Sequence, residues 1–205
     1  MGLLSIGAAP ALINYNLASD ALIHCLKVSG STFLIHDAVQ DCTARIEAAQ
    51  EQIRGLGIRA VRLTDDLKQK IAQYPPTHAP SPCFDDTSRV LPFALLYTRY
   101  VPFSHLSYSI LTFPSGTTGM PKAMPIPVSR HYATASLFPK TFGQTPGPNG
   151  DCSFYTIPLY HGTGGFSAMS DIMSGIAIAV APKFSLSQFW SDCIDSKSTI
   201  VVYGT

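Results

Sequence analysis

The stretch Y-S-I-L-T-F-P-S-G-T-T-G-M-P-K, residues Tyr108–Lys122, joins an apolar run to a loop rich in glycine and threonine. The run Tyr108–Phe113 is typical of a buried strand, and the loop Pro114–Lys122 follows it directly. Two glycines let the loop backbone approach an anion closely, and its hydroxyl and amide groups can donate to phosphate oxygens beside the Lys122 ammonium. The stretch therefore predicts a strand that ends in a phosphate-binding loop.

The loop does not follow the G-x-x-x-x-G-K-[ST] pattern of the P-loop NTPases. Its glycines are spaced differently, and Ala123 follows Lys122 where that pattern requires a hydroxyl residue. Glycine-rich, hydroxylated loops without a ligand are common in α/β proteins, so composition alone leaves a plain connecting loop open.

Strands and helices alternate on both sides of this loop. Upstream, the pattern predicts helices over residues 2–9 and 17–28 and then a strand–helix–strand unit over Thr32–His36, Thr43–Leu56 and Ile58–Leu63, with Asp41 as the helix cap. Downstream, it predicts helices over Ser129–Phe138, Gly165–Ser174 and Leu186–Asp195 and strands over Ser153–Ile157, Ile176–Ala181 and Thr199–Tyr203. Residues 74–107 are rich in proline and predict a surface excursion. We therefore expect an α/β fold of mostly parallel sheets flanked by helices.

Composition excludes several classes of function. The net charge is +1 and no basic stripe follows the chain, which argues against a nucleic-acid partner. Only 13% of the residues are charged, against roughly 25% in an average soluble domain, so we expect parts of the surface to be covered by a partner. The cysteines are odd in number and form no C-x-x-C pair, which argues against a disulfide framework or zinc site and favours a reducing, intracellular compartment (Cys25, Cys42, Cys83, Cys152 and Cys193).

Four stretches carry a resemblance to a known family. The run S-G-T-T-G-M-P-K, Ser115–Lys122, resembles the signature phosphate loop of the adenylate-forming (ANL) superfamily. The segments Ile13–Leu17, Pro158–His161 and Lys183–Cys193 resemble parts of the fatty acid transport proteins, the very-long-chain acyl-CoA synthetase branch. The resemblance reaches both ends of the chain and is weakest between about Ala72 and Ser107.

This resemblance implies a partial AMP-binding N-terminal domain over residues 1–205, with 74–107 as an excursion within it and no C-terminal subdomain. It implies a two-step ligase, in which a fatty acid is adenylated with ATP and Mg²⁺ and then transferred to CoA. The nucleotide site would be lined by Leu111, Thr112, Phe113, Pro114, Ser115, Gly116, Thr117, Thr118, Gly119, Met120, Pro121 and Lys122. Pro114 departs from the family pattern, and because proline lacks an amide N–H, a phosphate contact is lost there or the loop is stiffened.

Two residues are assigned to catalysis by the resemblance. Lys122 would neutralise charge on the leaving pyrophosphate, and His161 would donate to an oxygen near the developing adenylate. Without the resemblance, the favoured interpretation of His161 is a half-buried histidine bonded to backbone, because most single histidines have no site role. The pair Phe189–Trp190 is predicted to lie in the core, and the Gly162, Gly164 and Gly165 spacing is not a dinucleotide fingerprint.

The family's remaining active-site motifs have no counterpart in this sequence, including the acid that holds Mg²⁺ and the lysine of the C-terminal domain. We therefore expect a fragment, a truncated gene model or a degenerate paralogue, and the alternative function is a non-catalytic nucleotide- or lipid-binding remnant or an interaction module. An unrelated α/β protein with a chance loop is a third reading. The family also implies membrane association at endomembranes, peroxisomes or the plasma membrane, although no segment of this sequence predicts a transmembrane helix.

Overall fold

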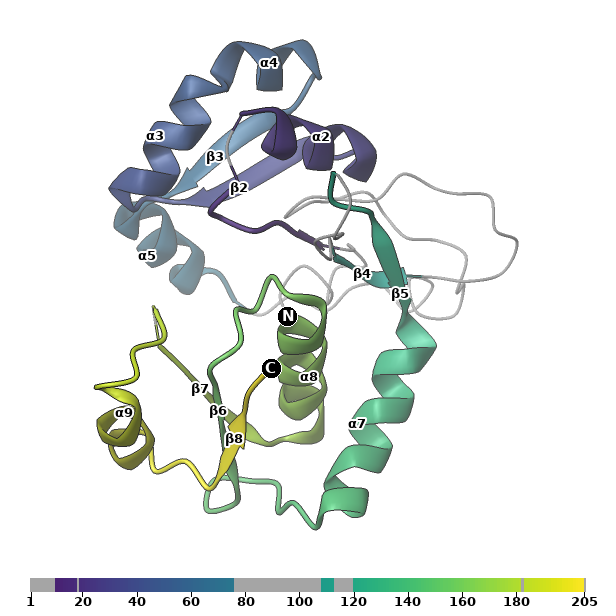
Figure 1. Ribbon diagram of the computed structural model, residues 1–205, viewed down its shortest axis with the longest axis vertical. Helices are drawn as coiled ribbons and strands as arrows, with labels where there is room; N and C mark the ends of the chain where they lie inside the picture. The colour runs from purple at the N-terminus through teal and green to yellow at the C-terminus, as the bar shows by residue number, and fades with distance from the viewer. Residues whose placement is uncertain (1–9, 18, 76–107, 113–119, 182, 205) are drawn as a thin grey trace. The chain divides into compact units, whose positions relative to one another are not determined.

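The computed structural model describes residues 10–17, 19–75, 108–112, 120–181 and 183–204 (Figure 1). The chain divides into two compact units, Met1–Val128 and Ser129–Thr205, and each is described by itself. The helix predicted over residues 2–9 and most of the proline-rich excursion lie outside the described residues.

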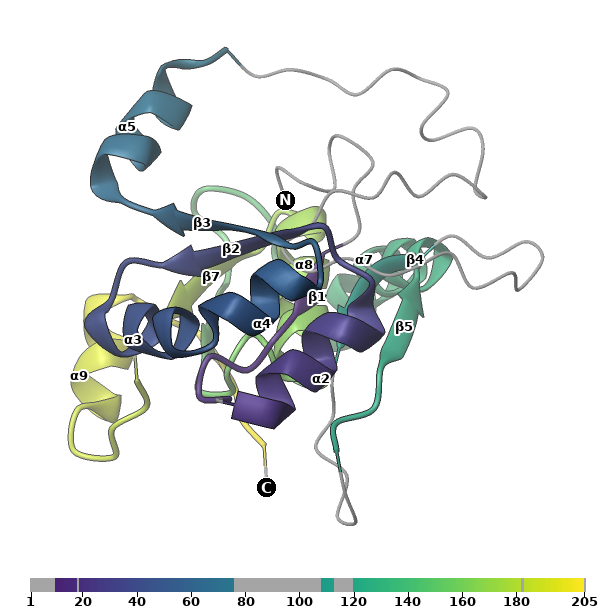
Figure 2. The same ribbon diagram turned by 90° about the horizontal axis from the view of Figure 1, so that it is seen from above.

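The first unit contains a strand–helix–strand motif that confirms the sequence prediction. Strands β2 (Phe33–Asp37) and β3 (Arg59–Leu63) pair in parallel, with Phe33 opposite Arg59 and Asp37 opposite Leu63. Figure 2 shows α3 (Gln40–Ala48) and α4 (Gln50–Gly55) along the same side of this pair, with α2 (Ser19–Ser29) beside them. The buried cluster that joins these elements is Ala11, Leu22, Leu26, Leu34, Ile46, Ala49, Ile53 and Ile58.

Two details of the helix predicted over Thr43–Leu56 are wrong. Asp41 lies within the first turn of α3 and does not cap it, because the helix begins one residue earlier and has Val39 at its N-cap, where no side-chain hydrogen bond is made. The single predicted helix is also divided at Ala49, whose ψ of 8° is far from the helical value. It ends as predicted near Gly57, which has a φ of +72° that glycine adopts without strain.

Helix α5 (Asp65–Gln73) was not predicted from the sequence. Thr64 caps it by accepting a hydrogen bond from the Leu67 amide at 3.3 Å. Its first turn carries two aspartates, which the helix dipole favours there. A hydroxyl residue followed by acidic residues is a helix-start signal that the sequence contains, although no side chain of this helix is buried.

The second sheet of this unit has the strand order β1–β4–β5. Strand β4 (Tyr108–Thr112) pairs in parallel with β1 (Ala11–Leu12) and antiparallel with β5 (Met124–Pro127). The strand predicted at Tyr108–Phe113 is confirmed over Tyr108–Thr112, and Phe113 lies outside the described residues. Strand β5 was not predicted, because its sequence M-P-I-P has two prolines, and proline is tolerated in a sheet chiefly on edge strands such as this one.

The second unit is a three-stranded parallel sheet with the order β7–β6–β8. Strand β6 (Cys152–Tyr155) lies between β7 (Ala177–Val180) and β8 (Ile200–Val202). Figure 1 shows α8 (Gly162–Ser174) and α9 (Phe189–Asp195) on opposite sides of the sheet. Right-handed crossovers require this, because α8 connects β6 to its neighbour β7 on one side, whereas α9 leads from β7 to β8 on the other side of β6. The helix α7 (Val128–Phe142) precedes β6, and the Ser174 hydroxyl of α8 donates to the Ala135 carbonyl oxygen of α7 at 2.7 Å.

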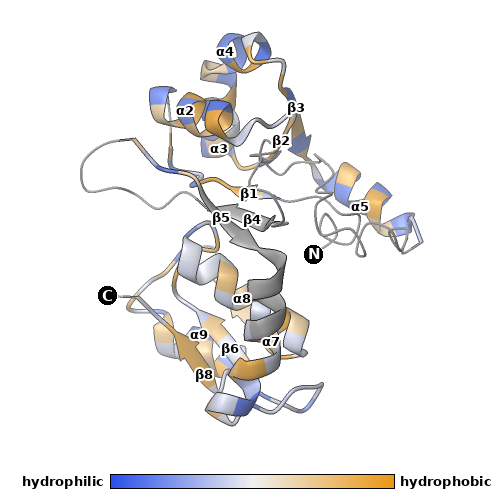
Figure 3. Cartoon of the chain, turned by 90° about the vertical axis from the view of Figure 1, so that its right-hand side faces the viewer, coloured by the Kyte–Doolittle hydropathy of each residue, from blue (hydrophilic) through white to orange (hydrophobic). Residues whose placement is uncertain are grey.

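The order of elements in this unit agrees with the predicted alternation, with one correction in α9. Phe189 packs against Phe154 of β6 with ring centroids 6.1 Å apart, but Trp190 is 74% exposed and does not lie in the core. Figure 3 shows the strongly apolar β8 beside a more mixed α9. Within the described parts of the chain, no helix has both the length and the apolar content needed to cross a membrane.

Candidate functional site

The predicted phosphate loop is held between two paired strands. Thr112, the last residue of β4, lies opposite Met124, the first residue of β5, so the chain leaves the sheet and returns to it at the same place. The connecting segment is residues 113–123. Residues 113–119 lie outside the described residues, so the roles of Phe113, Pro114, Ser115, Gly116, Thr117, Thr118 and Gly119 stay predictions.

The end of this connection is anchored to the body of the first unit. His24 of α2 donates from Nε2 to the Pro121 carbonyl oxygen at 3.0 Å, across 97 residues of sequence. Ala123 packs against the buried cluster of the unit. Between these two anchors Lys122 is exposed, and neither of the ion pairs among the described residues involves it. The Lys122 ammonium is therefore available to an anion.

Sequence reasoning missed His24. It lies on a helix whose neighbouring positions Leu22, Cys25 and Leu26 are buried, so an imidazole at this position needs a polar partner. That requirement could have indicated a long-range hydrogen bond. Nothing in the sequence indicates that the partner is Pro121.

His161 begins helix α8 at the carboxyl end of β6. The chain turns after the strand, and the His161 amide donates to the Pro158 carbonyl oxygen at 2.9 Å. His161 is the N-cap residue of α8, and its Nδ1 accepts a hydrogen bond from the Thr163 amide at 3.3 Å. The side chain is exposed, at the edge of a parallel sheet where open α/β folds bind ligands.

One of the glycines that follow His161, Gly164, has a packing role. A Cβ atom on Gly164 would lie 2.5 Å from the Pro158 carbonyl oxygen and 3.2 Å from Cγ2 of Ile157. The first turn of α8 therefore touches the backbone that leaves β6, and a side chain at this position would separate the two. This close approach fixes the direction of the turn that carries His161.

A buried polar pair lies behind this turn. The Tyr155 hydroxyl of β6 donates to Asp171 Oδ2 of α8 at 2.7 Å, and both residues are at most 5% exposed. Burial is the largest cause that raises the pKa of Tyr155 well above its usual range, and the hydrogen bond to Asp171 and the negative charge of Asp171 raise this pKa further. The pair joins the central strand to the helix that begins at His161.

The opposite end of β6 carries a second polar cluster that is structural. Asp151 accepts hydrogen bonds from the Thr199 hydroxyl at 2.6 Å and the Thr145 amide at 2.7 Å. These bonds, chiefly the one from Thr199, lower the pKa of Asp151. Because the cluster lies at the amino end of a parallel sheet, we assign it no ligand.

Solved structures define the class of the fold. The N-terminal domain of FACL13 from Mycobacterium tuberculosis matches with a TM-score of 0.68 at 19% identity, covering 97% of this chain and 44% of that chain. An o-succinylbenzoate coenzyme A synthetase from Bacillus subtilis, solved with AMP, matches with a TM-score of 0.63 at 18% identity, covering 97% and 34%. The fold is that of the N-terminal domain of adenylate-forming enzymes.

Sequence comparison then defines the family. The model of the AMP-binding enzyme family matches residues 1–205, and the chain belongs to this family. Isopenicillin N epimerase component 1 of Hapsidospora chrysogena is 50% identical over 99% of this chain, and long-chain fatty acid transport protein 1 of Homo sapiens is 29% identical over 99%. The resemblance read from Ser115–Lys122 and the three accompanying segments is thereby confirmed. The chain spans 25% and 30% of the lengths of these two relatives.

Proposed function

We propose that this chain supplies the ATP-phosphate-binding part of an acid–CoA ligase. In the reaction, the acid carboxylate attacks the α-phosphate of ATP, pyrophosphate leaves, and the CoA thiol then displaces AMP from the acyl-adenylate. The observation that carries the proposal is the family match along the whole chain, taken together with a strand–loop–strand frame around the predicted phosphate loop. The chain spans under a third of its relatives, so the complete reaction is proposed for an intact enzyme that contains this part.

The proposed roles within the loop are electrostatic. Ser115, Thr117 and Thr118, with the amides of Gly116 and Gly119, would hold the β- and γ-phosphates. Lys122 would neutralise charge that develops on the leaving pyrophosphate, and its exposure without an ion-pair partner supports this role. Mg²⁺ would neutralise the phosphates of ATP, and among the described residues no cluster of three acidic, histidine or cysteine side chains is present to hold it.

His161 is proposed to contact the acid or the adenylate. Its place after the carboxyl end of β6 and its exposure support this role. The ring would donate a hydrogen bond to an oxygen that gains charge during adenylation.

The acid is proposed to be a long-chain or very-long-chain fatty acid, because relatives named as fatty acid transport proteins match nearly the whole chain. These relatives also support a membrane-associated location. A second candidate is an acid of the isopenicillin N type, which the 50% identity to an isopenicillin N epimerase component favours. The non-catalytic alternative is a module that binds a nucleotide or lipid without turnover.

The phosphate-binding role is tested by calorimetric titration of the 205-residue chain with Mg-ATP. Lys122→Ala is expected to weaken binding by about tenfold or more, because a charge-assisted contact contributes about 1.5–3 kcal/mol. Lys70→Ala is the matched control, since it removes the same charge from an exposed ion pair on α5. Unchanged binding in Lys122→Ala, or equal losses in both variants, would overturn the assigned role.

Catalysis is tested separately from binding. ATP–pyrophosphate exchange is measured on an intact enzyme that contains this part, with oleate and with isopenicillin N as the acid, and acyl-CoA is measured after CoA is added. Exchange that depends on one acid identifies the substrate class. ATP binding without exchange for either acid favours the non-catalytic module.

A further inference from the structure

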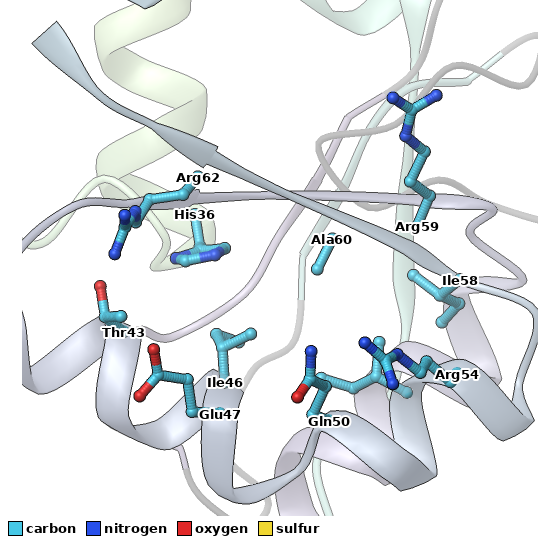
Figure 4. Close-up of a pocket in the computed structure, with 11 residues that line it drawn as sticks. His36, Thr43, Ile46, Glu47, Gln50, Arg54, Ile58, Arg59, Ala60 and Arg62 are labelled. Atoms are coloured by element: carbon cyan, nitrogen blue, oxygen red, sulfur yellow. The ribbon is translucent and has the colours of Figure 1, made fainter.

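A cavity of about 530 Å³ opens in the first unit between strands β2 and β3 and helices α3 and α4 (Figure 4). None of the described residues that line it belongs to the phosphate-loop segment. A volume of this size is within the range of small-molecule sites. The residues that line it are His36, Thr43, Ile46, Glu47, Gln50, Ile53, Arg54, Ile58, Arg59, Ala60 and Arg62.

The cavity has an apolar floor. Ile46 comes from α3, Ile53 from α4 and Ile58 from the position just before β3, and each is at most 8% exposed. They belong to the buried cluster of the unit, so the floor is part of its packed core. A ligand's apolar group could therefore contact a preformed surface without reorganising the fold.

Polar groups gather at one end of this floor. Figure 4 shows Arg62 of β3, His36 of β2 and Thr43 of α3 directed toward one another. The Thr43 hydroxyl oxygen is buried and has no hydrogen-bond partner among the described residues. Buried hydroxyl groups without a partner are uncommon, so this atom points to a missing one.

The charge of the cavity is predominantly positive. The ion pairs in the described part of the chain are those of Lys68 and Lys70 on α5, so neither Arg54 nor Arg62 is paired with a carboxylate. Among the described residues that line the cavity, Glu47 is the one acidic residue, and it offsets one of the arginines. Arg59 lies on the same strand as Arg62, but Figure 4 shows its side chain directed away from the helices, and its guanidinium lies 5.7 Å from the Phe33 ring centroid.

We propose that this cavity binds an amphiphilic oxyanion, a carboxylate or phosphate group attached to an apolar chain. The anionic group contacts the Arg62 guanidinium and the Thr43 hydroxyl, while the apolar part lies on Ile46, Ile53 and Ile58. His36 is not counted among the donors, because its Nδ1 already donates to the Asp37 carbonyl oxygen at 2.9 Å. Guanidinium suits this task because its charge is permanent and its planar donors match carboxylate and phosphate oxygens. The site is additional to the proposed nucleotide loop.

The test is calorimetric titration of the 205-residue chain with two amphiphiles, octyl phosphate and octanoate. Octanol probes the apolar half of the ligand alone, and inorganic phosphate probes the anionic half alone. We expect at least one of the two amphiphiles to bind, and each half alone to bind at least about tenfold more weakly. The tighter of the two amphiphiles identifies the anionic group. Failure of both to bind, or equal affinity for inorganic phosphate and octyl phosphate, would overturn the proposal.

Two arginine variants on one strand locate the site. Arg62→Gln is expected to weaken binding of the preferred amphiphile by about tenfold, while Arg59→Gln changes it by less than about twofold. Both variants lose one charge from β3, so equal losses would mean a diffuse electrostatic effect and would refute the assignment. Thermal unfolding of each variant checks that the fold is retained. Lys122→Ala is expected to leave amphiphile binding unchanged, which separates this site from the nucleotide loop.

Discussion

The two strand ends that carry the candidate residues are built differently. After β4, the chain forms a loop that returns to the same sheet, because Thr112 and Met124 are paired. After β6, the chain turns directly into a helix, with His161 as its cap and Gly164 against the Pro158 backbone. Among the described residues, the contacts of the first arrangement anchor the end of the loop at Pro121, whereas those of the second involve the turn itself, at Pro158, His161 and Gly164. We expect substitutions near the β6 turn to affect stability first and those near the β4 loop to affect ligand binding first.

The largest effect is expected for Gly164→Ala. The new Cβ atom would lie 2.5 Å from a backbone oxygen that has little freedom to move, so the free energy of unfolding should fall by up to about 3 kcal/mol. Urea denaturation measures this loss. Gly55→Ala on α4 is the control, because a Cβ atom there meets nothing within 4 Å and alanine favours a helix. If both variants are equally stable, the tight turn after β6 is not a feature of the protein.

A smaller effect is expected for Tyr155→Phe. The substitution leaves the buried Asp171 carboxylate without its hydroxyl donor, which should cost about 1–2 kcal/mol in the free energy of unfolding. The double variant Tyr155→Phe/Asp171→Leu removes both polar partners and should recover part of this loss. A double variant that is less stable than the sum of the two single variants would contradict the pairing.

The same tyrosine predicts a pH dependence. Its pKa is raised in the folded protein, whereas in the unfolded chain it ionises at about pH 10. The stability contributed by this group is therefore complete below about pH 10 and is lost as the pH rises above that value. Denaturation of the wild-type chain and of Tyr155→Phe at increasing alkaline pH should show a steeper decline for the wild type. Parallel curves would show that Tyr155 titrates normally.

The smallest stability effect is expected for His24→Leu, which affects the loop after β4 rather than the turn after β6. The variant removes the donor to Pro121 and should cost about 1 kcal/mol or less, since this bond is only partly buried. Under the proposed function it should weaken Mg-ATP binding several-fold, because the end of the loop loses an anchor. Lys27→Ala, at an exposed position of the same helix, is the control. A change in stability without any change in ATP affinity would limit His24 to a structural role.

Most of the fold could be predicted from the sequence because its signals are local. The strands at Phe33–Asp37 and Cys152–Tyr155 are short apolar runs, and the helices between strands have the expected apolar spacing. The strand at Met124–Pro127 could not be found this way, because its prolines argue against a strand and its stability comes from pairing with β4. Trp190 was misplaced because aromatic residues usually lie inside, and the sequence does not show which helix face meets the sheet.

The candidate site likewise has a part that local sequence signals predict and a part that they do not. The phosphate loop is a contiguous motif, so eight residues were enough to indicate it. The bond between His24 and Pro121, and the cavity between β2, β3, α3 and α4, are formed by segments that only the fold brings together. No local pattern in the sequence indicates either of them. Sequence motifs therefore located the proposed chemistry, whereas the groups that position it or bind a second ligand required the three-dimensional arrangement.

The bond between His161 and Thr163 limits what the histidine can do. A ring nitrogen that accepts a hydrogen bond carries no proton, so a neutral His161 capping α8 through Nδ1 must keep its proton on Nε2. Only Nε2 then remains for an incoming oxygen, and it meets that oxygen as a donor.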